Sequence, residues 1–140
     1  MIEGQTLDGF AQIAQGMNLP PLEVTITRAD LVRYAGAADD YVAQHWDQPM
    51  MLAAGFEDVV VHGWLGFAHM CRCVTNWAAP TVATIDSYRV RYLRPLYPGR
   101  VTCGGIVEEA SADKARLALW AQNIAGDKVT IADLVLRPVS

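Results

Sequence analysis

The chain has 140 residues, of which 52% are hydrophobic and 19% are charged, and its formal net charge is −4. This length fits one domain that can bury a core. The acidic balance argues against a nucleic-acid partner, because the chain has no basic stripe to neutralise phosphates. We therefore expect one domain over residues 1–140, with residues 1–18 as an N-terminal lead-in.

The high hydrophobic fraction also indicates apolar surface reserved for a partner. The three cysteines, Cys71, Cys73 and Cys103, do not have the spacing of a metal site and are interpreted as buried thiols in a reducing cytoplasm. Residues 1–18 lack the basic start of a signal peptide, and no apolar run reaches membrane-spanning length. We expect a cytoplasmic protein that does not bind a membrane.

The first half of the chain predicts short elements. Polar and apolar residues alternate over residues 23–27, which is typical of a strand with one buried face. Thr27 then offers an N-cap for a helix that begins at Arg28. A short helix is expected over residues 49–54, with Gly55 ending it.

The second half predicts one long helix followed by strands. Residues 63–77 are apolar on almost every side, with Arg72 as the only charge, so we expect this helix to be buried on nearly every side and enclosed by a sheet. The strands that follow, separated by turns, predict an antiparallel meander and an α+β fold. They are expected over residues 84–93, 101–109, 116–124 and 128–136.

Two neighbouring clusters carry most of the chemistry. Asp40 and His45 lie five residues apart, and a carboxylate with an imidazole can take a proton from water and give one to carbon. His62 and Gly63 open the long helix, where a free backbone N–H can stabilise a developing oxyanion. A glycine there would let the backbone approach a ligand closely.

These clusters resemble a known family. The run from Tyr34 to Asp47, followed by Gly55-Phe56 and by His62-Gly63, is similar to the pattern of the MaoC-like branch of the hot dog proteins, the (R)-specific enoyl-thioester hydratases and dehydratases. The strand that ends in Tyr92 before a Pro and a Pro-Gly turn also resembles this family. The likeness extends over about residues 19–137. It implies a single hot dog domain, an antiparallel sheet wrapped around one long central helix.

The resemblance implies a mechanism and its residues. Asp40 and His45 would hold one water, whose oxygen adds to C3 of a trans-2-enoyl thioester while a proton adds to C2 on the same face. The Gly63 N–H would polarise the thioester carbonyl. No metal and no redox cofactor are implied, and coenzyme A or acyl carrier protein would carry the acyl group. Further residues expected to contact the substrate are Trp64, His62, Phe56, Arg89, Arg91 and Arg94.

Some of these residues have a second interpretation. The arginines on the strand are candidates for the phosphates of the carrier, but arginines that alternate along a strand can equally form a solvated face. His62 is interpreted as orienting the turn into the helix rather than as a proton carrier. Asp47 is interpreted as a capping residue.

The chain departs from the family pattern at three places. Val42-Ala43 replaces an Asn-Pro pair, Ala38-Asp39 replaces Ser-Gly, and Trp64 replaces a Met. A valine cannot make the hydrogen bonds of an asparagine side chain. The bulk of Trp64 would reshape the acyl pocket.

Three functions are compatible with these residues. The first is a hydro-lyase that adds or removes water at a trans-2-enoyl or (3R)-hydroxyacyl thioester, working as a homodimer or as a heterodimer with another MaoC-like chain. The second is a non-catalytic MaoC-like subunit that binds the acyl chain for a catalytic partner. A hot dog thioesterase is the third and weakest, because those enzymes lack this spacing of Asp and His. The acyl group, fatty or steroid, the carrier and the physiological direction stay open.

Overall fold

The computed structural model describes residues 6–140, so residues 1–5 of the expected lead-in lie outside the described residues. Every helix and strand expected from the sequence is present, with ends that shift by at most two residues. The elements in chain order are η1 (Phe10–Gln12), β1 (Leu22–Ile26), α1 (Arg28–Ala38), η2 (Ala43–His45), α2 (Gln48–Ala53), α3 (Gly63–Trp77), β2 (Ala83–Tyr92), β3 (Gly99–Ala110), β4 (Ala115–Gln122) and β5 (Lys128–Pro138).

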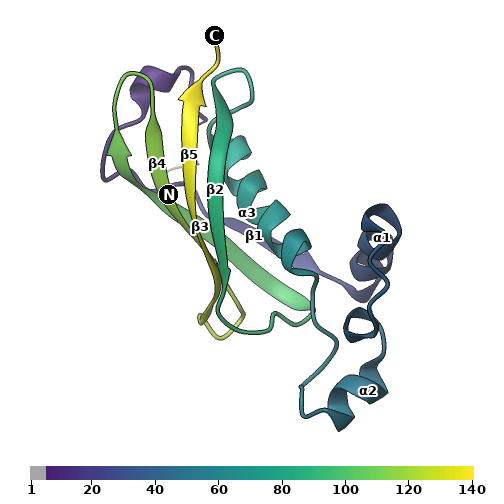
Figure 1. The fold of residues 1–140 in the computed structure, drawn as a ribbon. Helices are drawn as coiled ribbons and strands as arrows, with labels where there is room; N and C mark the ends of the chain where they lie inside the picture. Colours follow the sequence, from purple (N-terminus) through teal and green to yellow (C-terminus); the bar gives the residue numbers. More distant parts are fainter. Residues whose placement is uncertain (1–5) are drawn as a thin grey trace.

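The five strands form one antiparallel sheet in the order β1-β3-β4-β5-β2. The sheet curves around α3, which lies along its concave side (Figure 1). This confirms the α+β hot dog fold. The expected meander is wrong in one respect, because only β3, β4 and β5 follow one another. Residues 93–98 cross the sheet to β3, which lies between β1 and β4, instead of forming a hairpin with β2. Leu96 O accepts a hydrogen bond of 2.8 Å from Val61 N just before α3.

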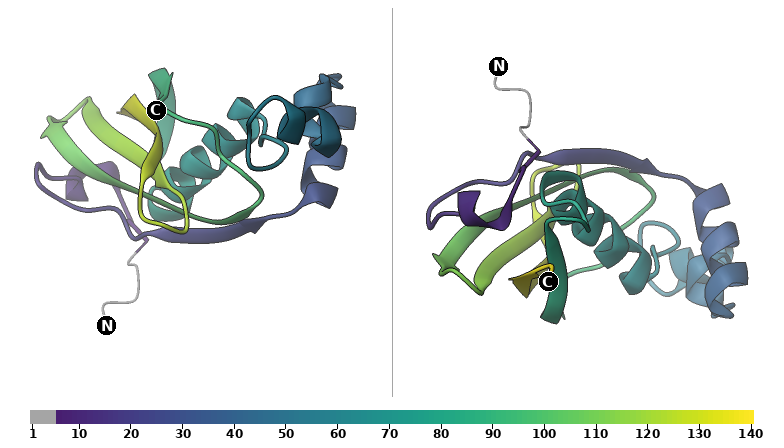
Figure 2. Two further views of the ribbon diagram at one scale, coloured as in Figure 1. Left: turned by 90° about the horizontal axis from the view of Figure 1, so that it is seen from below. Right: turned by 90° about the horizontal axis from the view of Figure 1, so that it is seen from above.

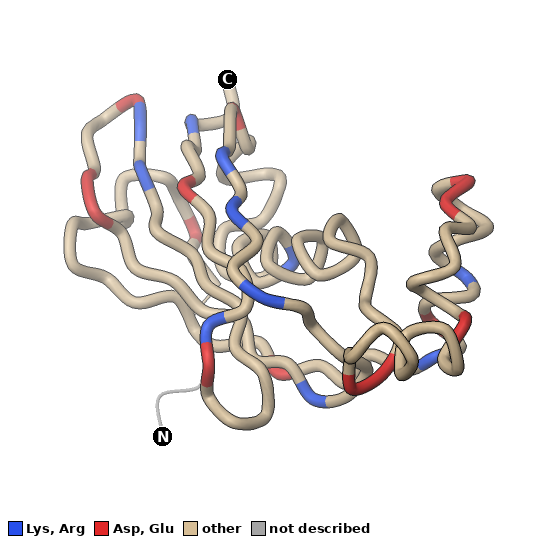
Figure 3. Tube along the Cα trace, turned by 60° about the horizontal axis from the view of Figure 1, so that its bottom comes forward, with Lys and Arg blue, Asp and Glu red and all other residues tan. Residues whose placement is uncertain are grey.

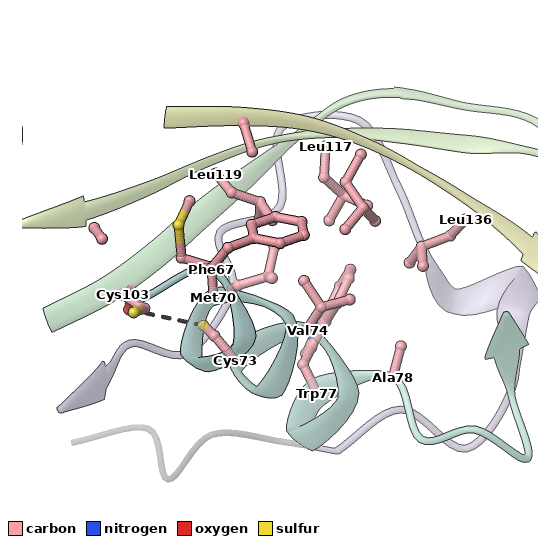
Figure 4. Packing of buried hydrophobic residues seen from close by; sticks show 14 of the residues in the cluster. Phe67, Met70, Cys73, Val74, Trp77, Ala78, Cys103, Leu117, Leu119 and Leu136 are labelled. Carbon is pink, nitrogen blue, oxygen red and sulfur yellow. Dashed lines mark hydrogen bonds between the residues drawn. The ribbon is translucent and has the colours of Figure 1, made fainter. Parts of the chain in front are cut away.

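The core lies between α3 and the sheet. Phe67, Met70 and Val74 of α3 point toward leucines of β4 and β5 (Figure 4), and the buried cluster also takes in Leu7 and Phe10 from the N-terminal segment. Residues 6–18 therefore contribute to the core in addition to leading into β1. Cys73 and Cys103 are buried as expected, whereas Cys71 is only half-buried.

The prediction that α3 is buried on nearly every side is wrong. Its buried face carries Phe67, Met70 and Trp77, but Trp64 and Arg72 on the other face are exposed. A single curved sheet covers only one side of a helix. Beside the uncovered face is a cavity of about 580 Å³, which lies between α1 and α3 and contains neither Asp40 nor His45.

The segment from α1 to α2, residues 28–53, stands away from the sheet as an arm (Figures 1 and 2). Thr27 caps α1 as predicted, since its side chain accepts a hydrogen bond from Asp30 N. Asp58 ties the arm to the segment that leads into α3. Its carboxylate accepts two bonds from Arg28 Nη2, at 2.7 and 2.9 Å, and one from Gln48 Nε2 at 3.3 Å.

Charged residues are distributed over the strands and the arm, and α3 carries a single one, Arg72 (Figure 3). No continuous basic stripe is visible in this view of the described chain. None of the helices in residues 6–140 combines the length and the apolar character that crossing a membrane would require.

Candidate active site

Asp40 and His45 meet at the edge of a cavity between the arm and the start of α3. His45 Nε2 lies 3.7 Å from Asp40 Oδ2. That separation is too long for a direct hydrogen bond but lets both atoms contact one small molecule. The His45 side chain is 5% exposed, whereas the Asp40 side chain is 39% exposed. The pair therefore combines a fixed imidazole with a carboxylate that is open to solvent.

Backbone contacts set the orientation of His45. Its Nδ1 lies 2.5 Å from Val60 O, and because a carbonyl can only accept, Nδ1 carries the hydrogen. In the neutral ring the lone pair is then on Nε2, which faces Asp40. Val60 N in turn donates to Gln44 O at 2.9 Å, so the loop that carries the dyad is bonded to the segment that enters α3.

His62 contacts both members of the pair. Its ring stacks on that of His45, with centroids 3.7 Å apart and an angle of 19° between the planes. Its Nε2 donates to Asp40 O at 3.2 Å, and its Nδ1 is buried without a hydrogen-bond partner among the described residues. Burial lowers the pKa of His62, an effect that the bond to Asp40 O opposes. His62 is therefore mainly neutral near pH 7.

The departures from the family pattern leave the loop ordered. Asp39 occupies the left-handed region, with φ 53° and ψ 38°, where the pattern has glycine and where aspartate is among the better-tolerated residues. Val42 N lies 3.3 Å from Asp40 Oδ1, and Trp46 Nε1 donates to Tyr41 O at 2.8 Å. These bonds hold the loop without an asparagine side chain.

Gly63 begins α3, so its N–H has no partner within the helix. The structure gives a different reason for glycine here from the one expected. A Cβ at this position would lie 2.8 Å from Cζ and 2.9 Å from Cε1 of Tyr92. The missing side chain therefore makes room for the Tyr92 ring at the end of β2.

The cavity has a volume of about 520 Å³ and includes Asp40, His45 and Gly63. Of the residues expected to contact the substrate, His62, Trp64 and Arg94 also line it, whereas Phe56 does not. Thr130 is a further, buried polar residue in its wall. Six of the nine predicted site residues thus come together around one cavity.

The three predicted arginines are divided between the two faces of the sheet. Arg89 and Arg91 line a depression with Trp120 on the face opposite α3. The alternation of side chains along β2 explains this, because Tyr88 and Tyr92 point toward α3. Only Arg94, which follows β2, reaches the cavity, and its Nη1 lies 3.4 Å from a carboxylate oxygen of Asp127.

Asp40, His45 and His62 offer possible metal-ligand atoms within 4.8 Å of one another. An imidazole binds a metal along a lone pair in the plane of its ring. The two rings here are nearly parallel and stacked, so their lone pairs run side by side and do not converge on one ion. This geometry favours the prediction of a site without a metal, which stays a prediction.

Several contributors were missed by the sequence analysis. Gln44 Nε2 lies 3.3 Å from His45 Nε2, Val60 O fixes the ring, and Tyr92 covers Gly63. Val60 and Tyr92 reach the site only where separate segments cross, so no motif identifies them. Gln44 directly precedes His45, but no sequence pattern marks its side chain as a partner of the ring. Asp47, by contrast, caps α2 as predicted, accepting a hydrogen bond from Met50 N at 3.1 Å.

The chain is similar to known proteins in sequence and in fold. A family model described as "MaoC like domain" matches residues 10–128. Protein MaoC of Klebsiella aerogenes is 29% identical over 119 residues, which are 79% of this chain but only 36% of that relative, so the chain spans about a third of its length.

Two solved structures show the same fold. The ChsH1-ChsH2 complex from Mycobacterium tuberculosis has 27% identity and a TM-score of 0.81, over 90% of this chain and 98% of that chain. The unliganded R-hydratase PhaJ1 from Pseudomonas aeruginosa has 20% identity and a TM-score of 0.84, over 93% and 84% of the two chains. Since the family model covers most of the sequence, this chain belongs to the MaoC-like dehydratase family of hot dog proteins.

Proposed function

We propose that this chain is a hydro-lyase that adds water to a trans-2-enoyl thioester or removes it from a (3R)-hydroxyacyl thioester. One observation carries the proposal: His45 Nε2 and Asp40 Oδ2, 3.7 Å apart, border a cavity that also contains the first N–H of α3. The same cavity thus holds two proton acceptors and one donor for an oxyanion.

In the proposed reaction a water donates hydrogen bonds to Asp40 and to the Nε2 lone pair of His45. The pair takes one proton as the water oxygen bonds to C3, and the C2–C3 π electrons move toward the thioester carbonyl. The Gly63 N–H stabilises the resulting enolate oxygen. The pair then returns a proton to C2, so that one water has been added and no electron has been transferred.

The carrier is proposed to approach along the wall formed by Arg94. This arginine is half-exposed at the cavity and is held only by an exposed ion pair with Asp127. Such pairs contribute little, so a phosphate of coenzyme A or of acyl carrier protein can displace the carboxylate. Arg89 and Arg91, on the other face of the sheet, have no part in this proposal.

The test is the hydration of a short and a bulky trans-2-enoyl-CoA, followed by loss of the enoyl absorbance. We expect turnover by the wild type and a loss of at least about 100-fold in Asp40→Asn and in His45→Ala, since each removes one proton acceptor. Asp39→Asn is the matched control, because it makes the same chemical change one residue away. It should keep wild-type turnover.

Equal losses in Asp39→Asn and Asp40→Asn would contradict a specific role for Asp40. Wild type that binds acyl-CoA and turns over neither substrate would reject the stand-alone enzyme. That result would support the alternative function, a subunit that binds the acyl chain for a catalytic partner.

We also propose that the protein works with a second MaoC-like chain, identical or different. Trp64 and Tyr88 on the open side of α3 and β2 are 55% and 52% exposed. β2 is an edge strand, paired within the described chain only to β5. Exposed aromatic side chains beside the free edge of a strand are typical of an interface. The ChsH1-ChsH2 structure is a complex of two different chains, which supports a heteromeric arrangement here.

Light scattering after gel filtration tests this assembly. A dimer mass for the purified chain would support self-association. A monomer that becomes a heterodimer when a second MaoC-like chain is added would support the heteromeric form. A monomer mass both for the purified chain and after addition of the second chain would contradict the proposal.

A further inference from the structure

Tyr92 brings a hydroxyl group to the beginning of α3. It is the last residue of β2 and pairs with Thr130 of β5. The atoms nearest to a Cβ placed on Gly63 are Cζ, Cε1 and Oη of Tyr92, at 2.8, 2.9 and 3.1 Å. The phenol end of the side chain, rather than its base, therefore lies against Gly63. Both residues line the cavity that contains Asp40 and His45.

The Tyr92 hydroxyl is available as a donor. The Tyr92 side chain is 49% exposed where it lines the cavity, so its O–H can reach a bound ligand. Burial raises the pKa of this phenol, and the neighbouring Tyr34 and Tyr88 raise it further. The group is consequently protonated across the neutral range and can give a hydrogen bond to a ligand oxygen.

A thioester oxygen at the Gly63 N–H would thus have a second donor nearby. We propose that Tyr92 is a catalytic residue whose O–H donates a hydrogen bond to the thioester oxygen beside the Gly63 N–H. This inference rests on the hydro-lyase function proposed above. In this proposal, two donors stabilise the negative charge that develops on the thioester oxygen. One is the Gly63 N–H at the start of α3, and the other is the Tyr92 O–H at the end of β2.

The direct test is Tyr92→Phe, which removes one oxygen atom and keeps the ring that packs on Gly63. We expect kcat for hydration of a short trans-2-enoyl-CoA to fall about 10- to 100-fold, with KM little changed, because the donor acts mainly on the charge of the transition state. Tyr88→Phe is the matched control. It makes the same change four residues earlier on the same face of β2, where the ring contacts Phe67, and it should keep wild-type kcat.

A second measurement detects the hydrogen bond without turnover. The carbonyl stretch of bound butyryl-CoA, labelled with ¹³C at the carbonyl, is recorded by difference infrared spectroscopy. We expect a smaller shift to low frequency in Tyr92→Phe than in the wild type, and no difference between the wild type and Tyr88→Phe. The signal comes only from folded protein with ligand bound, so a merely structural role of Tyr92 would not change it.

The two measurements distinguish a wrong role for Tyr92 from a wrong proposed function. Wild type that hydrates enoyl-CoA while Tyr92→Phe retains both kcat and carbonyl frequency would overturn the role of Tyr92 and leave the proposed function intact. Wild type without turnover would reject the proposed function, and the infrared comparison would still decide whether Tyr92 reaches the thioester oxygen. Wild type that does not bind butyryl-CoA would overturn both.

Discussion

The sheet with α3 and the arm formed by residues 28–53 differ in how far they bury their apolar side chains. The sheet and α3 bury the main core, including Val74, Leu117 and Leu134 at 0% exposure. The arm instead exposes large apolar side chains, among them Val32 at 67% and Trp46 at 58%. Yet the arm contains both Asp40 and His45. The main core and the Asp40–His45 pair therefore lie in separate parts of the molecule, which meet where His62 stacks on His45.

The largest expected effect is on the core. Leu117→Ala should lower the free energy of unfolding by about 2–5 kcal/mol, because it removes buried methyl groups and leaves a cavity. Val32→Ala in the arm should change it by less than about 0.5 kcal/mol, since that side chain is exposed. Urea unfolding of both variants compares the two regions. Similar losses in the free energy of unfolding of the two variants would contradict this difference between the core and the arm.

The contribution of His62 to the free energy of unfolding, at the junction between the arm and α3, should depend on pH. Because burial lowers the pKa of His62 from 6.5, the unfolded chain binds a proton below about pH 6.5 that the folded chain does not. This contribution to stability is complete above that pH and is lost on acidification, at up to about 1.4 kcal/mol per pH unit. Urea unfolding at pH 7.5 and 5.5 should show a smaller acid loss in His62→Phe than in the wild type. Equal losses would contradict a neutral, buried His62.

The attachment of the arm depends on Asp58. Asp58→Ala removes the bonds to Arg28 and Gln48 and should cost about 1 kcal/mol, since the pair is half-exposed. Hydrogen exchange should become faster in residues 28–53 and stay unchanged in β4 and β5. Arg137→Ala, which removes an ion pair with Asp86 on the sheet, is the control. Uniform acceleration throughout the chain would contradict a local tether.

The smallest effect is expected at Asp39. Its φ of 53° is in the region that favours glycine. Asp39→Gly should therefore raise the free energy of unfolding by about 0.5 kcal/mol, the relief of strain exceeding the greater freedom of the unfolded chain. Thermal unfolding measures the change. A clear destabilisation would show that the Asp39 side chain makes a contribution of its own.

The sequence predicted local features well and distant contacts poorly. Periodicity gave the bounds of α3 and the strands, and the spacing of Asp40 and His45 led to the dyad, because these patterns depend on nearby residues. The pairing of β2 with β5 and the open face of α3 depend on how segments cross, which no local pattern records. The position of the Tyr92 ring beside Gly63 was missed for the same reason.

The proposed function requires Asp40 and His45 to add water across the double bond of an enoyl thioester. The most direct measurement is the reaction of a trans-2-enoyl-CoA in D₂O, with the product analysed by NMR. We expect one deuterium at C2, in a single diastereomer with the C3 hydroxyl on the same face, and no product from Asp40→Asn. A mixture of diastereomers, or the same product from Asp40→Asn, would contradict it.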